Sequence, residues 1–150
     1  LGDNIENKKG DILNLNQKIY KRFYKFNDFQ FIAIGTKEIN MQVENLVAQL
    51  QSGTNTEMTK WFFLLQESKY SKNLFESLGT DLKLDEFHGS PYVFIIDKKG
   101  FLRGRNDSDG IKFGYDMRSV AELNNYMVDD VKIILAEYRL ALKKNNILDN

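Results

Sequence analysis

The only histidine and the only proline of this chain lie close together, in the stretch FHGSPYVFIIDKKGFLRGR that spans residues 87–105. Neutral imidazole is a common metal ligand. Proline lowers the trans preference of the peptide bond before it enough for a tight native constraint to hold the cis form. His88, Gly89, Ser90 and Pro91 are therefore the first candidates for a binding site.

A metal site at His88 would need further ligands, because metal sites normally use three or four. The chain has no cysteine, so thiolate ligands, disulfides and thiol nucleophiles are excluded within these residues. Asp85, Glu86 and a few scattered methionines are the remaining ligand candidates. The expectation is that no cofactor is bound, with copper at His88 as the alternative. A lone histidine in a polar loop is usually solvated, and Pro91 could equally be a trans residue that starts a strand.

Two other motifs give weaker indications of a binding site: one of a calcium loop, and one of a helix that binds nucleic acid or a membrane surface. RNDSDG, residues 105–110, with Asp116 downstream has part of the oxygen spacing of an EF-hand loop. Its first ligand position holds Arg105 and its twelfth holds aspartate rather than glutamate, so a solvated loop is expected. KIYKRFYKF, residues 18–26, mixes basic and aromatic side chains. Ile19, Phe23 and Phe26 are explained as core residues, with the basic side chains on the solvent-exposed face of the helix.

Charge and hydropathy exclude some classes of partner. Lys plus Arg and Asp plus Glu number 21 each, so the chain has no net field that would attract nucleic acid. No apolar stretch approaches the length of about 18 residues needed to cross a bilayer, so no membrane insertion by this chain is expected. The aromatic content of 13% makes self-association through an exposed apolar patch an open alternative.

Periodicity predicts elements that alternate along the chain. Apolar residues every three or four positions predict a helix over about 11–25, with Asp11 as its N-cap. FQFIAIG, residues 29–35, and WFFLLQ, residues 61–66, are typical of buried strands. A helix between them has an apolar face of Val43, Leu46, Val47 and Leu50 and ends at the turn-rich SGTNT. A short helix with Leu74, Phe75 and Leu78 follows the second strand, and Gly79 can end it through a left-handed C-cap.

The last third of the sequence predicts a hairpin and a long helix. PYVFIID reads as a strand headed by Pro91, DKKG as a turn with positive φ at Gly100, and FLRGR as the return strand. Ser119 and Glu122 have capping-box spacing. The helix that they open has one apolar side formed by Val120, Leu123, Met127, Val131, Ile134, Leu135, Tyr138 and Leu142. Strands separated by helices predict one α/β domain over residues 1–150, with a polar segment at 1–10 and a polar tail at 144–150.

These residues resemble a known superfamily. GSPYVFIIDKKGFLRGR is similar to the part of thioredoxin-like proteins in which a small residue and a cis-proline precede a strand, an Ile-Asp pair, a turn ending in glycine, and a second strand. Over about residues 11–143, the order of elements resembles the branch with AhpC/TSA peroxiredoxins, TlpA reductases and Sco/SenC copper chaperones. WFFLLQ with its short helix resembles the tryptophan-led strand and helix of the Sco and TlpA branches, and VDDVKIILAEY resembles their closing helix.

The resemblance implies a three-layer fold, with a mixed sheet flanked by helices, and places His88 and Ser90 on the active or partner-binding edge. The family carries a C-x-x-C or C-x-x-x-C motif at the start of the helix matching residues 11–25, preceded by a central strand. This chain lacks both the cysteines and that strand. In Sco proteins a histidine joins two cysteines in binding copper. Gly89 stands at the matching position here, with His88 one residue earlier.

Two functional hypotheses follow. The first is a cysteine-free, non-catalytic thioredoxin-like domain that binds a protein partner through residues 88–91 and through an unfilled sheet edge. The second is a fragment of a Sco-like or TlpA-like thiol-redox or copper-chaperone protein, whose cysteines and first strands lie upstream of Leu1. The resemblance would then imply an extracytoplasmic or periplasmic, membrane-tethered protein.

Overall fold

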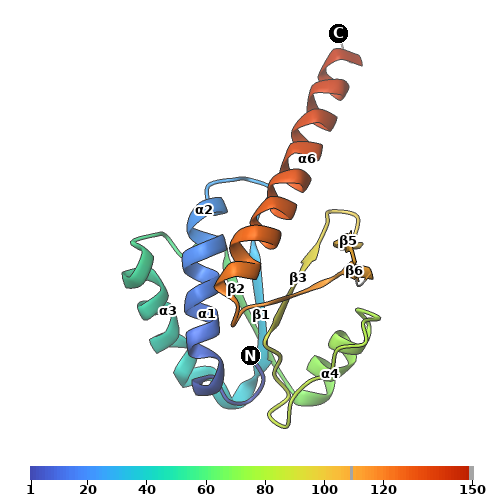
Figure 1. Cartoon of the computed structure of the whole chain (residues 1–150). Helices are drawn as coiled ribbons and strands as arrows, with labels where there is room; N and C mark the ends of the chain where they lie inside the picture. Colours follow the sequence, from blue (N-terminus) through green and yellow to red (C-terminus); the bar gives the residue numbers. More distant parts are fainter. Residues whose placement is uncertain (109, 149–150) are drawn as a thin grey trace.

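A computed structural model describes residues 1–108 and 110–148, and it is a mixed arrangement of helices and small sheets (Figure 1). None of the helices in this described part is long and apolar enough to cross a membrane.

The expected first helix is present and starts earlier than predicted. A 3-10 turn, Glu6–Lys8, leads into α1, Lys9–Leu15, which continues through a π-helical turn, Asn16–Tyr20, into α2, Lys21–Phe23. Asp11 is therefore not the N-cap and lies in the first turn of α1. A carboxylate in this turn is still favoured by the positive end of the helix dipole.

The predicted strand–helix–strand unit is confirmed. β1, Phe31–Thr36, pairs in parallel with β2, Trp61–Gln66, in a register that sets Phe31 beside Trp61. Between them lie a 3-10 turn, Lys37–Ile39, and α3, Asn40–Thr54. The turn-rich segment ends α3 as expected, because Asn55 takes a left-handed conformation and its N–H donates to the Gln51 carbonyl over 2.8 Å.

The second half of the fold begins with the short helix α4, Ser68–Glu76. Gly79 follows it with a φ of +67°, as the sequence predicted. β3, Tyr92–Ile96, then turns through Gly100, with a φ of +84°, into β4, Leu102–Arg103.

The return strand is interrupted by a hairpin that the sequence did not predict. β5, Arg105–Asp107, pairs with β6, Gly110–Lys112, and β7, Gly114–Asp116, then pairs with the first half of β3. Position 109 of the weak EF-hand match lies outside the described residues. Residues 105–107 and 110 of the motif lie in these strands, instead of the solvated loop that the sequence predicted.

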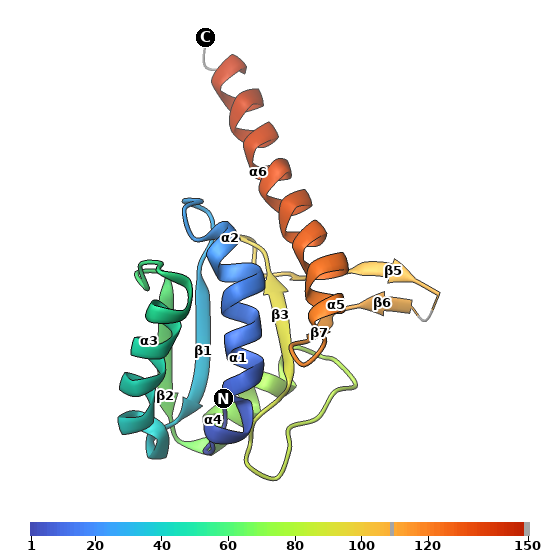
Figure 2. The same ribbon diagram turned by 60° about the vertical axis from the view of Figure 1, so that its left-hand side comes forward.

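The C-terminal helix is confirmed, and half of its predicted capping box forms. It runs through α5, Val120–Glu122, a π-helical segment, Leu123–Met127, and α6, Val128–Leu148. Ser119 Oγ accepts from the Glu122 N–H over 3.2 Å, whereas the Glu122 carboxylate accepts from the Asp116 N–H over 2.8 Å, not from Ser119. The apolar side is buried from Leu123 to Ile134. Val120, before it, is 39% exposed, and Leu142 is exposed because α6 runs past the rest of the molecule (Figures 1 and 2).

An aromatic cluster forms the centre of the core. Tyr20, Phe29, Phe31 and Trp61 are buried against one another, with ring centroids between Phe31 and Trp61 4.6 Å apart. Each such side chain contributes about 1.5–3 kcal/mol through burial. Phe26, which was expected in the core, is 48% exposed, because the chain has left the helix before it reaches this residue.

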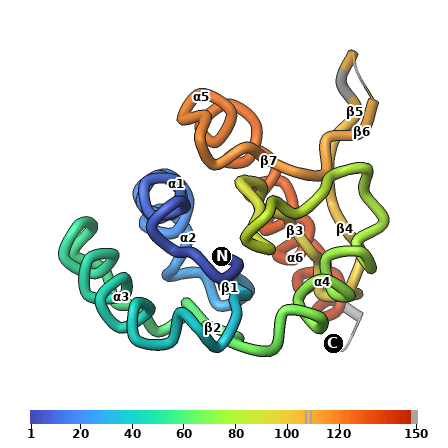
Figure 3. The backbone as a smooth tube through the Cα atoms, turned by 90° about the horizontal axis from the view of Figure 1, so that it is seen from below, coloured from blue at the N-terminus to red at the C-terminus, as the bar shows by residue number. Residues whose placement is uncertain are grey.

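The strands do not form the single mixed sheet that was expected. Among the described residues, β1 and β2 make one sheet, β4, β3 and β7 make a second, and β5 and β6 a third. Helices α1 and α3 lie on the same side of β1 and β2 (Figures 2 and 3). On the other side, Ile32, Phe62 and Leu64 remain exposed. The gap between β1 and β3 is the feature on which the candidate site depends.

Candidate functional site

The peptide bond before Pro91 is trans, so the predicted cis-proline is wrong in this structure. Pro91 stands immediately before β3, where its missing N–H interrupts no ladder. Its carbonyl accepts from the Met117 N–H over 2.9 Å, and the Tyr92 N–H is taken by Ser90 Oγ over 3.1 Å. Pro91 therefore acts as a strand starter, which is the alternative interpretation of the sequence.

His88 lies in a tight loop whose side chains bind other residues of the same chain. Its backbone is left-handed, with a φ of 55°, and its Nδ1 lies 3.2 Å from Asp3 Oδ2. Asp85, the nearby ligand candidate, is bound by Lys8 Nζ over 2.6 Å. Among the described residues, no three histidine or carboxylate groups gather in a way that could hold a metal ion.

Asp85 organises this loop through backbone hydrogen bonds. Its Oδ1 accepts from the N–H groups of Phe87 and Gly89, each over 2.9 Å. Burial opposes ionisation of this carboxyl group. The hydrogen bonds from Lys8, Gly89 and Phe87 outweigh that cost and hold its pKa below the ordinary value. These contacts fix the shape of the loop, and most of its polar groups are engaged in hydrogen bonds within the chain.

The first residues of the chain lie between this loop and the end of β1. Gly2 forms a parallel bridge with Gly35; the Leu1 nitrogen donates to the Ile34 carbonyl over 2.7 Å, and the Thr36 N–H to the Gly2 carbonyl over 3.0 Å. On the other side, the Asp3 N–H donates to the Phe87 carbonyl over 2.9 Å. Residues 1–3 thus fill one end of the space between β1 and the segment that leads into β3.

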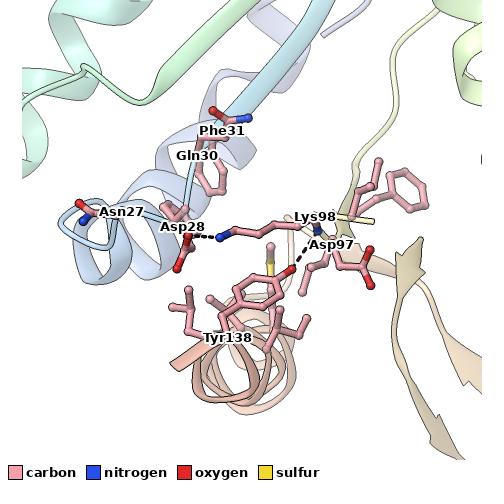
Figure 4. A pocket seen from close by; sticks show the side chains of 15 residues that line it. Asn27, Asp28, Gln30, Phe31, Asp97, Lys98 and Tyr138 are labelled. Carbon is pink, nitrogen blue, oxygen red and sulfur yellow. Dashed lines mark hydrogen bonds and ion pairs between the residues drawn. The ribbon is translucent and has the colours of Figure 1, made fainter. Parts of the chain in front are cut away.

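The other end of that space is a cavity of about 370 Å³ (Figure 4). Its walls come from the residues that enter β1, from the last residues of β3 and the turn after it, and from the inner face of α6. The apolar part of the lining consists of Phe29, Phe31, Phe94, Ile95, Ile96, Met127, Val131, Ile134 and Leu135. No backbone ladder joins β1 to β3 within the described residues. We call this space the β1–β3 gap.

An ion pair crosses the mouth of the gap. Lys98, in the turn after β3, extends its ammonium group to Asp28, which precedes β1 (Figure 4). Tyr138 of α6 supports the lysine, because its hydroxyl accepts from the Lys98 N–H over 2.9 Å and its ring lies 4.9 Å from Nζ. The mouth is therefore bridged by a surface pair, which is weak enough to open.

Sequence reasoning missed the gap, although it predicted the elements around it. Its lining combines three segments far apart in the sequence, and each looks like ordinary core when taken alone. The one available signal was the polar start of the chain, which left a predicted α/β sheet without a central strand.

Sequence reasoning also missed a buried polar cluster that fixes the β5–β6 hairpin to the C-terminal helix. Tyr115 is fully buried and donates to Asp130, whose carboxylate also pairs with Arg105 Nε over 3.2 Å. Burial, together with the hydrogen bond to Asp130, raises the pKa of Tyr115 well above its usual value. Every member of the cluster has a partner, which is typical of a structural anchor rather than a reactive site.

Comparisons with known proteins found no relative of this chain. No family model, no curated protein and no solved structure matches it.

Proposed function

We propose that this chain is a thioredoxin-like domain that works as a non-catalytic binding module and takes up an extended protein segment in the β1–β3 gap. The observation that carries the proposal is the gap itself: two strands face the same partly apolar cavity, and no ladder joins them among the described residues. Strand edges without a partner bind extended peptides through main-chain hydrogen bonds, and apolar walls receive the side chains.

The order of elements supports the thioredoxin-like assignment. A helix, a parallel β1–α3–β2 unit, a short helix, an antiparallel hairpin and a closing helix follow one another as they do in that superfamily. In that fold a central strand lies between the strands that correspond to β1 and β3, which is the place of the gap. Neighbouring strands are spaced about 4.8 Å apart, so one added strand would turn two small sheets into one.

The chemistry of the chain supports binding over catalysis. Thiol-disulfide exchange and peroxide reduction need a thiolate, and the sequence has no cysteine. The loop that carries His88 is held by Asp3, Asp85 and Lys8. We therefore place the binding edge at the gap rather than at His88, Gly89, Ser90 and Pro91.

Peptide titration followed by NMR tests this proposal. We would add a peptide of alternating valine and threonine with terminal lysines to the ¹⁵N-labelled chain. The control is the same peptide with proline at its centre, which removes a main-chain donor. Shifts confined to the amides of Phe31–Ala33 and Phe94–Ile96 are expected with the first peptide and not with the second. Equal shifts with both peptides, or none with either at millimolar concentration, would rule the proposal out.

The bridge between Gly2 and Gly35 favours a second candidate function. Residues 1 and 2 already run parallel to β1, and the same ladder extended upstream would pass Ala33 and Phe31 and fill the gap. The chain would then be part of a longer Sco-like or TlpA-like protein, with its central strand before Leu1. The family's motif position at the start of the first helix falls within this chain and holds no cysteine, so thiols would have to lie elsewhere in the upstream sequence. The mass of the intact native protein separates the candidates. Additional upstream sequence with a strand and cysteines would support the second, and a native chain of this mass would support the first.

A further inference from the structure

The second half of α6 projects from the molecule and carries an uncovered apolar stripe (Figures 1 and 2). Ile133, Leu140 and Ile147 are exposed over 55%, 59% and 74% of their surface. They recur every seven residues, so they lie on one face of the helix. That face points away from the body, because Leu140 lies nine positions, or half a turn in projection, from the buried Val131.

Two opposite charges flank the centre of this stripe. Glu137 lies three residues before Leu140 and Lys144 four residues after it, on the same flank of the helix. Arg103 binds the Glu137 carboxylate over 3.0 and 2.9 Å, yet the side chain stays 47% exposed. An antiparallel copy of the helix, centred on Leu140, would place its Lys144 beside Glu137 and its Ile147 beside Ile133. In a parallel copy this flank would instead face the opposite flank of the partner helix, which carries Lys132 and Arg139, so Lys144 would meet a like charge.

We propose that α6 is a self-association surface that pairs with α6 of a second copy of this chain, antiparallel about Leu140. The arrangement is isologous, because each copy contributes the same stripe to a two-fold interface. Burial of three aliphatic side chains per copy drives the association, and the paired Glu137 and Lys144 flanks fix its direction. This inference is independent of the β1–β3 gap, which lies on the other side of α6.

Sedimentation of the whole chain over a range of concentrations tests the surface. The wild-type chain is expected to shift from monomer to dimer as concentration rises, and Leu140→Glu to remain monomeric. Leu142→Glu is the matched control, because Leu142 is 57% exposed and lies on the other side of the same helix. A monomer up to millimolar concentration, or a dimer lost equally in both variants, would overturn the proposal.

Cysteine pairs test the direction of the helices, and the cysteine-free chain gives them a clean background. Under mild oxidation, Leu140→Cys should form a disulfide-linked dimer. A mixture of Ile133→Cys and Ile147→Cys chains should cross-link, whereas either variant alone should not. Efficient cross-linking of Ile133→Cys with itself would contradict the antiparallel arrangement. Each variant is first checked for folding by the fluorescence of the single, buried tryptophan, Trp61.

Discussion

Gly2 and Gly35 form an isolated parallel bridge, and this contact holds the start of the chain beside β1. Gly2 has a φ of +69°, and a Cβ atom there would lie only 2.6 Å from the Gly89 nitrogen. The first residues can therefore pack between β1 and the 87–89 loop only because position 2 has no side chain.

Gly2→Ala should therefore destabilise the fold. The added methyl group meets backbone on the 87–89 loop and the left-handed conformation is strained, which together cost about 1–3 kcal/mol in free energy of unfolding. Urea denaturation followed by Trp61 fluorescence measures the change. Gly10→Ala is the control, because Gly10 lies in α1 with open space around it, and this variant should gain about 0.5–1 kcal/mol. Equal stability of Gly2→Ala and wild type would show that the bridge is unimportant.

Local patterns predicted most elements, and long-range contacts account for what they missed. The predicted strand WFFLLQ has the same first and last residues as β2. Gly79 and Gly100 take the positive φ that their turns require. The β5–β6 hairpin has no apolar alternation; its observed anchor is the ion pair between Arg105 and Asp130, residues 25 positions apart.

The candidate site shows the same limit. The sequence directed attention to the lone histidine and proline, because rare residue types stand out in a single chain. The gap instead arises where β1, β3 and α6 fail to close on one another. Periodicity identifies which face of an element is apolar, but it does not show whether the facing elements meet.

Lys98→Met should open the mouth of the β1–β3 gap with little effect on stability. The pair with Asp28 lies at the surface, so its loss should cost less than about 1 kcal/mol. If the gap binds a strand, the valine–threonine peptide should associate faster with this variant, as measured by stopped-flow fluorescence of Trp61. Lys99→Met, beside it in the same turn, should leave the rate unchanged. A slower rate in Lys98→Met would mean that the lysine helps to bind the peptide.

Asp85→Asn should loosen the loop that carries His88 and make the protein less sensitive to acid. The folded-state pKa of Asp85 lies below its ordinary value of 3.8, so its contribution is present above that pH and is lost as the pH falls through the folded pKa. The variant should be less stable at pH 7 by about 1–3 kcal/mol, since Lys8 loses its partner and two N–H groups lose a charged acceptor. The difference from wild type should shrink below pH 4. A constant difference across that range in urea denaturation would contradict the assignment.

Tyr115→Phe tests the buried cluster at alkaline pH. The pKa of Tyr115 is raised above 10.0, so its contribution is full below pH 10 and is lost as the pH rises toward the folded-state value. Unfolding should therefore become easier above pH 10 in the wild type. The variant should lose about 1–3 kcal/mol at pH 7, because Asp130 loses a buried donor.

The loss of stability between pH 10 and 11 should then be smaller in Tyr115→Phe than in the wild type. Some alkaline dependence should remain, because burial also raises the pKa of Tyr20. Tyr126→Phe is the matched control: this half-exposed tyrosine contacts Arg105 through its ring, so the substitution keeps the contact. It should leave both the stability at pH 7 and the alkaline slope unchanged. A Tyr115→Phe slope equal to that of the wild type would show that the Tyr115 hydroxyl does not couple folding to pH.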